Sequence, residues 1–378
     1  MPETIAKKSL IDYFSALEVP RQAWKVEYPL PEMLLLVLCA NMAGAETFVE
    51  TTQWGRTKLE FLRKLLPFKR GIPSHDALND VVNALDANLF SECFSAWVES
   101  LRDNEPEIVA IDGKTSRRAH AREGHALHTV SAWAARQRLV LGQQATAEKS
   151  NEITAIPLLL ERLQLSGALV TIDAMGCQTA IAQKVIDKGA DYLLALKNNQ
   201  LSLAREVELF FTDPERCPEI PHETIDADHG RIETRRHWVS HEVDWLTSRR
   251  RFPDEPRFPG LKAIAVVEAV IMDKATGKTT SARRFYISSL ALDQGFFAKA
   301  VRAHWGVENR LHWVLDVVFH DDLMRLRTQN GPKNMATVKH MALNLIKSAP
   351  GKQSLRVKRK AAGCDDTFLL ATIRSQTQ

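Results

Sequence analysis

The sequence predicts an α/β fold in which a sheet is covered by helices on both faces. Apolar segments of strand length occur at residues 107–112, 168–173 and 191–197, and segments with helical patterns separate them. Further helix-like segments precede and follow this region. Because strands that are apolar throughout need cover on both sides, this alternation favours a sheet between helical layers.

Composition and length favour a globular protein with more than one structural unit. The chain has 378 residues, of which 45% are apolar and 25% charged. The 50 basic residues slightly outnumber the 46 acidic ones, which permits a nucleic-acid partner without requiring one. Five scattered cysteines without metal-ligand spacing favour a reduced, cytosolic protein. The longest apolar run, residues 33–40, is too short to span a bilayer, so we expect no membrane association.

We expect residues 1–104 to form an N-terminal helical domain. The segment "LPEMLLLVLCANMAGAETFVETTQWG" is Pro-started and is predicted to be one long helix. The segment "PSHDALNDVVNALDANLFSECFSAWVESL" begins with Ser74 as a predicted N-cap and continues with apolar residues at helical spacing. Two roles stay open for this domain, which are packing and binding of a DNA end.

Residues 105–211 contain the strands and helices of the predicted core. "EIVAID" is predicted to be a short strand that ends at Asp112, and "HTVSAWAA" and "LVLGQQAT" form a predicted hairpin. "NEITAIPLLLERLQL" is predicted to be a helix, "ALVTID" a strand ending at Asp173, and "DYLLALK" a third buried strand. Between these two strands, "CQTAIAQKVIDKG" is predicted to be an amphipathic helix that stops at Gly189. After the third strand, "QLSLAREVELFF" is predicted to be a final helix.

The rest of the chain divides into three predicted parts. Residues 212–293 form a β-rich insertion that contains the strand-like segments "GRIETRRHWV", "LKAIAVVEAVIM" and "ARRFYISSL". Residues 294–350 return to helices, starting with "GFFAKAVRAHWGVENRLHWVLDVVF". Residues 351–378 form a basic C-terminal tail, which is either solvated or a phosphate-contacting arm.

Asp112 and Asp173 each follow an apolar strand, at the edge of an open sheet where ligands gather. Two neighbouring carboxylates repel each other unless a cation lies between them. Mg²⁺ binds through a few carboxylates together with water and phosphate oxygens. The pair is therefore a candidate half-site for metal-assisted phosphoryl transfer, and the alternative is that each aspartate only caps a turn.

Glu308 is the candidate third acid. It lies in the aromatic-rich segment "RAHWGVENRLHWVLDVVFHDD", where an unpaired carboxylate is costly to bury. A metal ion would offset that cost, and so would pairing with Arg302 or Arg310. Two further metal sets rank lower, namely zinc bound by Glu308, His312 and Asp316, and a site in which Asp321 or Asp322 replaces Glu308.

Several segments of the chain resemble one transposase family. "AIDGKTSR", "LGQQATAEKSNEITAIPLLLERLQLSGALVTIDAMGCQTAIAQKVIDKGADYLLALKNNQ", "DHGRIETRRHWV" and "RAHWGVENRLHWVLDVVFHDD" resemble the ISAs-type insertion-sequence DDE transposases, a group that includes the H-repeat-associated proteins of enteric bacteria. The similarity runs through nearly the whole chain. It implies an RNase H-like mixed sheet with flanking helices, a β-rich insertion and an N-terminal helical domain.

The resemblance also implies a catalytic, metal-binding triad of Asp112, Asp173 and Glu308, with Mg²⁺ as cofactor and Mn²⁺ as its substitute. Asp112 would bridge two ions, and Asp173 and Glu308 would each complete the shell of one ion. The implied substrates are double-stranded DNA, namely the terminal repeats of the element and the target DNA. A homodimer on DNA is implied as well, in a bacterial cytoplasm and associated with the nucleoid when bound.

The side chains expected to contact DNA lie near these acids or on the insertion. Three cations follow Asp112, two residues follow the third buried strand, two arginines share one face of a strand in the insertion, and two flank Glu308. Each group has an alternative role. The three cations after Asp112 could lie in a solvated loop, and the two residues after the third strand could form a turn. The two arginines of the insertion could belong to a cross-strand charge ladder, and the last two could pair with Glu308. The residues are Lys114, Arg117, Arg118, Lys197, Asn199, Arg231, Arg235, Arg302 and Arg310.

One departure from the family pattern concerns the residues around Glu308. Related transposases have Tyr, Arg and Lys at fixed spacing from the glutamate, where this chain has Val301, His304 and Leu315. Two alternative functions also stay open. The first is a catalytically inactive, transposase-derived DNA-binding protein, and the second is a metal-dependent nuclease that cuts DNA without strand transfer.

Overall fold

The structure is a computed structural model, and it describes residues 8–17, 27–103, 105–120, 126–146, 152–217, 220–228, 230–248 and 252–374. For residues 117–120, 247–248 and 252–256 it describes the backbone alone.

A nine-stranded mixed sheet forms the centre of the described chain, in the order β3-β2-β1-β4-β5-β11-β10-β7-β6. Strands β1, β4 and β5 are parallel, and the other neighbours pair antiparallel. The strands are β1 (Ile108–His120), β2 (Ala126–Ala134), β3 (Leu139–Thr146), β4 (Leu169–Ile172), β5 (Asp191–Leu196), β6 (His222–Asp226), β7 (Arg231–Ser240), β10 (Ala263–Asp273) and β11 (Thr279–Ser288). Strands β8 (Thr247–Ser248) and β9 (Phe252–Pro256) form a separate small sheet.

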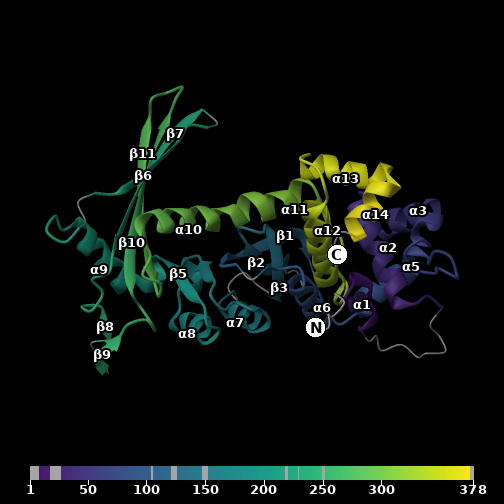
Figure 1. The fold of residues 1–378 in the computed structure, drawn as a ribbon, viewed down its shortest axis with the longest axis horizontal. Helices are drawn as coiled ribbons and strands as arrows, with labels where there is room; N and C mark the ends of the chain where they lie inside the picture. The colour runs from purple at the N-terminus through teal and green to yellow at the C-terminus, as the bar shows by residue number, and fades with distance from the viewer. Residues whose placement is uncertain are drawn as a thin grey trace, which may run out of the picture.

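Helices cover both faces of the sheet, which confirms the predicted fold class. Figure 1 shows α10 along one face and α7 and α8 on the opposite face. The N-terminal helices are α1 (Leu10–Ser15), α2 (Leu30–Met42), α3 (Phe48–Thr57), α4 (Leu59–Leu62), α5 (His75–Ala84) and α6 (Ala87–Glu99). The others are α7 (Glu152–Arg162), α8 (Thr179–Asp187), α9 (Leu201–Thr212), α10 (Gln294–Val307), α11 (Trp313–Val317), α12 (Gly331–Ser348), α13 (Leu355–Cys364) and α14 (Asp366–Arg374). Short 3₁₀ turns are η3 (Ala174–Gly176), η4 (Asn198–Gln200) and η6 (Asp321–Leu323), and η5 (Glu308–His312) is a π turn.

The first core strand is longer than the sequence suggests. We predicted that it ends at Asp112, but β1 continues to His120. Its parallel pairing with β4 does stop at Ile111, which pairs with Ile172. Beyond that point β1 pairs with β2 alone, so a strand with a polar second half remains hydrogen-bonded on one side. The predicted hairpin is confirmed as β2 and β3.

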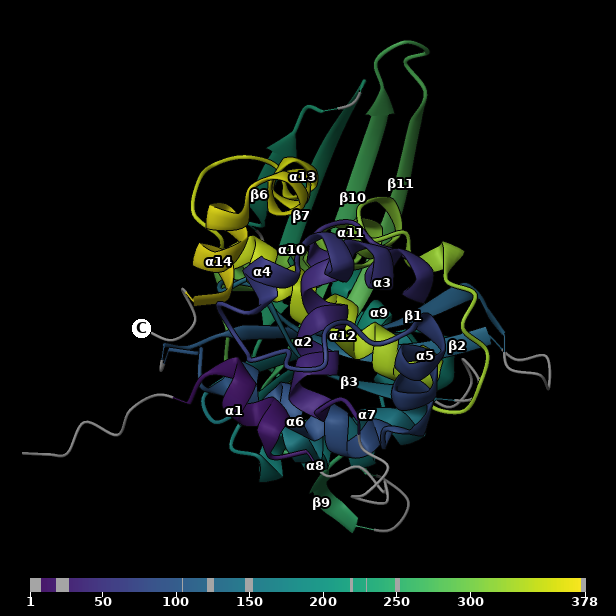
Figure 2. The same ribbon diagram turned by 90° about the vertical axis from the view of Figure 1, so that its right-hand side faces the viewer.

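The predicted β-rich insertion joins the same sheet. Strand β11 pairs antiparallel with β5, from Phe285 opposite Leu196 to Ser288 opposite Leu193, and β10, β7 and β6 follow it outward. Figure 2 shows the outer parts of β10 and β11 projecting beyond the helices. The insertion therefore lengthens the sheet that carries the two aspartates.

The two long N-terminal helices predicted from the sequence are each divided. The first stops at Met42, because Gly44 takes a φ of +109° and Thr47 caps α3 through a hydrogen bond with the Glu50 amide. The second begins after Ser74, which is the predicted N-cap, and a new helix starts after Asp86. Each division occurs where a side chain satisfies the free amide groups of a new helix start.

The predicted basic tail is wrong for residues 355–374, which form α13 and α14. Two of its cations, Lys358 and Arg359, are buried. The Arg359 guanidinium donates to the Asn41 carbonyl at the end of α2, so its charge joins helices instead of facing phosphates. One apolar core extends from Leu10 to Ile373 and unites the N- and C-terminal helices.

None of the helices in the described ranges has the length and apolarity that crossing a membrane requires.

Candidate active site

Asp112 and Asp173 lie beside each other at one edge of the parallel strands. Each immediately follows one of the register partners Ile111 and Ile172. Since neighbouring strands are about 4.8 Å apart, the two carboxylates emerge from adjacent backbone positions. Asp173 also caps η3, where its Oδ1 accepts hydrogen bonds from the Met175 and Gly176 amides. The capping role thus uses one oxygen of Asp173.

Burial raises the pKa of Asp112 to about 7, and the negative charges of Asp173, Glu152 and Glu308 add to the increase. The Gly113 amide donates to Oδ1 of Asp112 and acts in the opposite direction. Acidic groups from four separate segments therefore share one electrostatic environment. Among the described residues, however, no three His, Cys, Asp or Glu side chains are grouped closely enough to hold a metal ion.

Glu308 is the first residue of a π turn between α10 and α11. Its side chain is exposed, as expected for the alternative of a surface glutamate, but in the described residues neither Arg302 nor Arg310 forms an ion pair with it. The Lys347 ammonium donates to the Arg310 carbonyl at 3.3 Å and lies over the Trp133 ring, which braces the turn. Such turns inside α-helices are frequent at functional sites.

The helix that bears Glu308 is attached to both aspartate strands. On β4, Thr171 Oγ1 lies 3.0 Å from Nδ1 of His304. On β1, Lys114 Nζ lies 2.7 Å from Asp316 Oδ1, and Asp112 Oδ2 lies 3.6 Å from Nδ1 of the buried His312. The contacts of His304 and His312 were missed by the sequence analysis, because their partners are far away in the chain.

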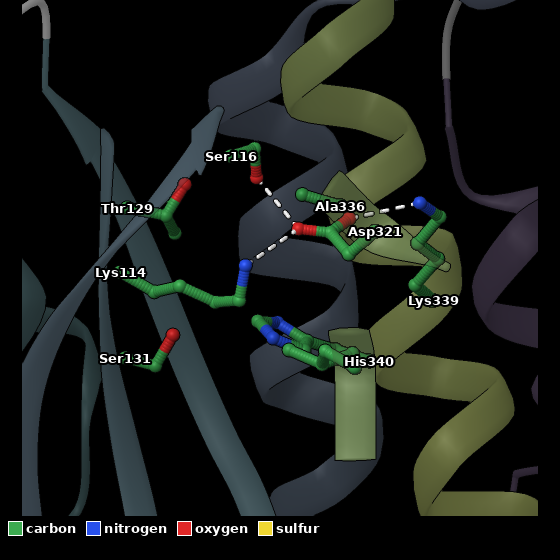
Figure 3. A pocket seen from close by; sticks show the side chains of 9 residues that line it. Lys114, Ser116, Thr129, Ser131, Asp321, Ala336, Lys339 and His340 are labelled. Carbon is green, nitrogen blue, oxygen red and sulfur yellow. Dashed lines mark hydrogen bonds and ion pairs between the residues drawn. The ribbon is translucent and has the colours of Figure 1, made fainter. Parts of the chain in front are cut away.

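Lys114, which we predicted to contact DNA with a solvated loop as the alternative, lies in a buried charge cluster (Figure 3). Its side chain is 10% exposed, and its ammonium also lies 3.2 Å from Asp321 Oδ2. The Asp321 carboxylate is further bound by Ser116 at 2.6 Å and Lys339 at 2.8 Å. Although burial opposes it, the charges of Lys339 and Lys114 hold the pKa of Asp321 well below its usual range. Asp321 is thus occupied by cations and does not replace Glu308.

A second buried pair, His128 and Glu152, lies behind Gly113, and no local pattern in the sequence pointed to it. His128 Nε2 lies 2.6 Å from Glu152 Oε1, and Thr115 Oγ1 lies 2.8 Å from His128 Nδ1. A Cβ at Gly113 would lie 2.6 Å from His128 Nε2 and in still closer contact with the Glu152 carboxylate. Position 113 therefore has no room for a side chain.

We expect Gly113→Ala to impair the site locally. The new methyl group would push the His128–Glu152 pair away and shift the backbone beside Asp112, and overpacking of this kind costs about 1–3 kcal/mol. Chemical unfolding would measure the lost stability, with Gly306→Ala as the control because a Cβ there meets open space. Equal stability of the two variants would contradict this prediction.

A groove of about 1630 Å³ lies between α10 and the strands of the insertion. Its lining includes four of the cations predicted to contact DNA, namely Arg231, Arg235, Arg302 and Arg310. It also includes Trp305, Gly306 and Asn309, which flank Glu308 in sequence. The structure thus brings these cations from two distant segments to one groove. The three candidate acids do not line it, and its lining includes Ile108, Leu169 and Asp191, at the ends of β1, β4 and β5 opposite the two aspartates.

The remaining predicted residues have different positions. Lys197 is exposed after β5. The Asn199 side-chain amide donates to the Ala174 carbonyl and thereby braces the loop that follows Asp173. The side chains of Arg117 and Arg118 lie outside the described residues.

Comparison with known proteins identifies the family. Residues 103–345 match the family described as "Transposase DDE domain", and residues 11–98 match the one described as "DDE_Tnp_1-associated". The chain belongs to the DDE transposase family.

Relatives of this DDE transposase chain match it over nearly its whole length. It is 38% identical to "H repeat-associated putative transposase YhhI" of Escherichia coli K12, over 97% of this chain and 98% of that protein. It is 39% identical to "Putative transposase YncI" of Escherichia coli O157:H7, over 97% and 95% respectively. Among solved structures, a piggyBac transposase synaptic complex with hairpin DNA aligns with a TM-score of 0.42 and 11% identity, over 97% of this chain and 80% of that one. The resemblance to H-repeat-associated transposases is therefore confirmed.

Proposed function

We propose that this chain is the active transposase of an insertion sequence, which cuts the ends of the element and joins them to target DNA. One observation carries the proposal. Asp112 and Asp173 follow register partners on adjacent parallel strands, and the charges of Asp173 and Glu308 both act on Asp112. Like charges gathered in this way are unfavourable without a cation, so the donor set suits a divalent metal ion.

Asp112, Asp173 and Glu308 would hold Mg²⁺, or Mn²⁺ in its place. When bound, such ions activate a water or a DNA 3′-hydroxyl and stabilise the leaving oxygen. Asp112 is positioned by its strand and by the Gly113 amide, and Asp173 keeps one oxygen outside its η3 cap. Glu308 is exposed and must turn its side chain toward the aspartates to join them, a motion that its surface position permits.

The substrate in this proposal is double-stranded DNA carrying the terminal repeats, together with a target duplex. The groove between α10 and the insertion would receive the DNA backbone, since phosphate contacts position a duplex without reading its sequence. Two element ends have to be handled together, so we propose that a homodimer forms on DNA.

A second candidate function is DNA binding without catalysis. It is favoured by one observation, which is that Glu308 is exposed and that the acids share no coordination shell in the described residues. A nuclease that cuts without joining has the same site and differs only in strand transfer.

The test is cleavage of a duplex that carries one element end, with Mg²⁺, with Mn²⁺ and with a chelator. We expect cuts with either metal and none with the chelator. Glu308→Gln should lower the cleavage rate about a thousandfold, since a metal site supplies several kcal/mol of transition-state stabilisation. DNA binding of the variant, measured by fluorescence anisotropy, should remain.

The other outcomes separate the candidates. Binding by the wild type without nicking in either metal would support the inactive protein. Nicking without joined products in a strand-transfer assay would support the nuclease. Normal cleavage by Glu308→Gln would refute the triad.

A further inference from the structure

Two arginines from opposite walls of the groove converge on one carboxylate oxygen. Arg235 on β7 places Nη1 2.7 Å from Oδ2 of Asp226, and Arg302 on α10 places Nη2 2.9 Å from the same oxygen. Asp226 is the last residue of β6, and all three residues line the groove. A carboxylate between two guanidinium groups has the charge and acceptor geometry of a phosphate between them.

The pairing of β6 with β7 indicates that Asp226 has a role beyond a charge ladder that only stabilises the strands. Asp226 lies directly opposite Glu233 in the β6–β7 register, and like charges at such positions destabilise a sheet. Arg235 offsets the repulsion, because its Nη2 also lies 2.6 Å from Glu233 Oε2. Arg302 also stabilises the Asp226 carboxylate, and it does so from a helix across the groove instead of from the two paired strands.

Two of the three side chains are accessible, and the third, Arg235, is 20% exposed. Asp226 is 43% exposed and Arg302 is 59% exposed, so solvent and a ligand can reach their polar atoms. Ion pairs this exposed contribute little stability, typically below about 1 kcal/mol each. A stronger anion can therefore take the place of Asp226 at small cost.

We propose that the Asp226 carboxylate occupies the position of a DNA backbone phosphate. Arg235 and Arg302 then form a phosphate site that an internal anion fills in the free protein. Entry of DNA displaces Asp226 and transfers both arginines to the phosphate. Asp226 thereby weakens binding to DNA in general, and this inference rests on the proposed function of the chain as a DNA-binding transposase.

The test measures binding of the full chain to a duplex of arbitrary sequence, without divalent metal so that no cleavage occurs. Asp226→Asn should bind about three- to tenfold more tightly, because DNA no longer competes with two exposed ion pairs. Both arginines neutralise the same phosphate in the variant and in the wild type, so the slope of log affinity against log salt between about 50 and 200 mM should change little. Asp226→Glu keeps the charge and should bind like the wild type.

Asp228→Asn is the matched control. Asp228 lines the same groove and, within the described residues, forms no ion pair, so this variant removes one negative charge without releasing an arginine. We expect it to tighten binding by less than about twofold, the effect of a single screened charge. In an Arg302→Gln background, Asp226→Asn should lose most of its gain.

Three results would overturn the inference, namely equal effects of Asp226→Asn and Asp228→Asn, weaker binding by Asp226→Asn, or an undiminished gain in the Arg302→Gln background. Thermal unfolding of each variant checks that the strands of the insertion stay folded. If the wild type binds and cuts DNA but Asp226→Asn behaves like its control, the inference fails alone. If the wild type does not bind DNA at all, the proposed function fails with it.

Discussion

Asp112→Asn is expected to abolish DNA cleavage and, in the metal-free protein, to raise stability at alkaline pH. The loss of cleavage should be at least about a thousandfold, because Asn cannot supply the anionic oxygens that a pair of divalent ions requires. DNA binding should change little, since the cations of the groove that are predicted to contact DNA lie on the insertion, on α10 and on η5.

The gain in stability follows from the raised pKa of Asp112, which is about 7 in the folded protein. The unfolded chain releases this proton near the ordinary pKa of 3.8. Between these two values the folded state holds a proton that the unfolded state has lost, so stability falls as the pH rises from about 4 to about 7. Asn carries no such penalty. The variant should therefore match the wild type at about pH 4 and exceed it by about 1–3 kcal/mol at about pH 8.

Urea unfolding in the presence of a chelator, at both pH values, tests the stability part of this prediction. Asp80→Asn is the control, because Asp80 is exposed on α5 and far from the cluster in sequence and fold. If the variant still cuts DNA, Asp112 is not required for cleavage. If the variant is less stable than the wild type at alkaline pH, the Asp112 carboxylate does not lower the stability of the fold in exchange for function.

The sequence was sufficient to predict that Asp112 and Asp173 end two buried strands, but not the contacts that support them. The apolar segments ending at Ile111 and Ile172 indicated the parallel pairing, because a strand buried on both faces shows as an unbroken apolar run. The polar second half of β1 hid its continuation to His120, since only its pairing with β2 makes it a strand. Local pattern cannot report pairing with a partner elsewhere in the chain.

Lys114 shows the same limit for charge. A lysine followed by arginines is typical of a solvated, phosphate-facing loop, yet its partners Asp316 and Asp321 lie about two hundred positions later. Likewise, Glu152 lies within a segment that resembles the transposase family, but its pairing with His128 depends on the way α7 meets β2. Buried ion pairs of this kind become predictable only when the topology is known.

Lys114→Met is expected to destabilise the protein by about 3 kcal/mol, the second large effect. Removing one partner of a buried charge cluster leaves the others poorly compensated, which typically costs about 3–5 kcal/mol. Here Asp321 would keep Lys339 and Ser116, while Asp316 would lose the ammonium at 2.7 Å. We place the loss at the lower end of that range for this reason. Chemical unfolding at neutral pH would measure it.

The double variant Lys114→Met with Asp321→Asn separates lost charge compensation from lost packing. If Lys114→Met is destabilising because it leaves the charge of Asp321 uncompensated, neutralising that carboxylate should restore about 1–2 kcal/mol of unfolding free energy. Asp321→Asn alone should still be destabilising, because it leaves both lysines short of a counter-ion. The exposed pair of Lys184 and Glu161 is the control, and Lys184→Met should cost less than about 1 kcal/mol. Additive losses in the double variant would mean that Lys114 acts through the packing of its own side chain. The buried carboxylate that joins the strand of Asp112 to the helices beyond Glu308 would then not be its point of action.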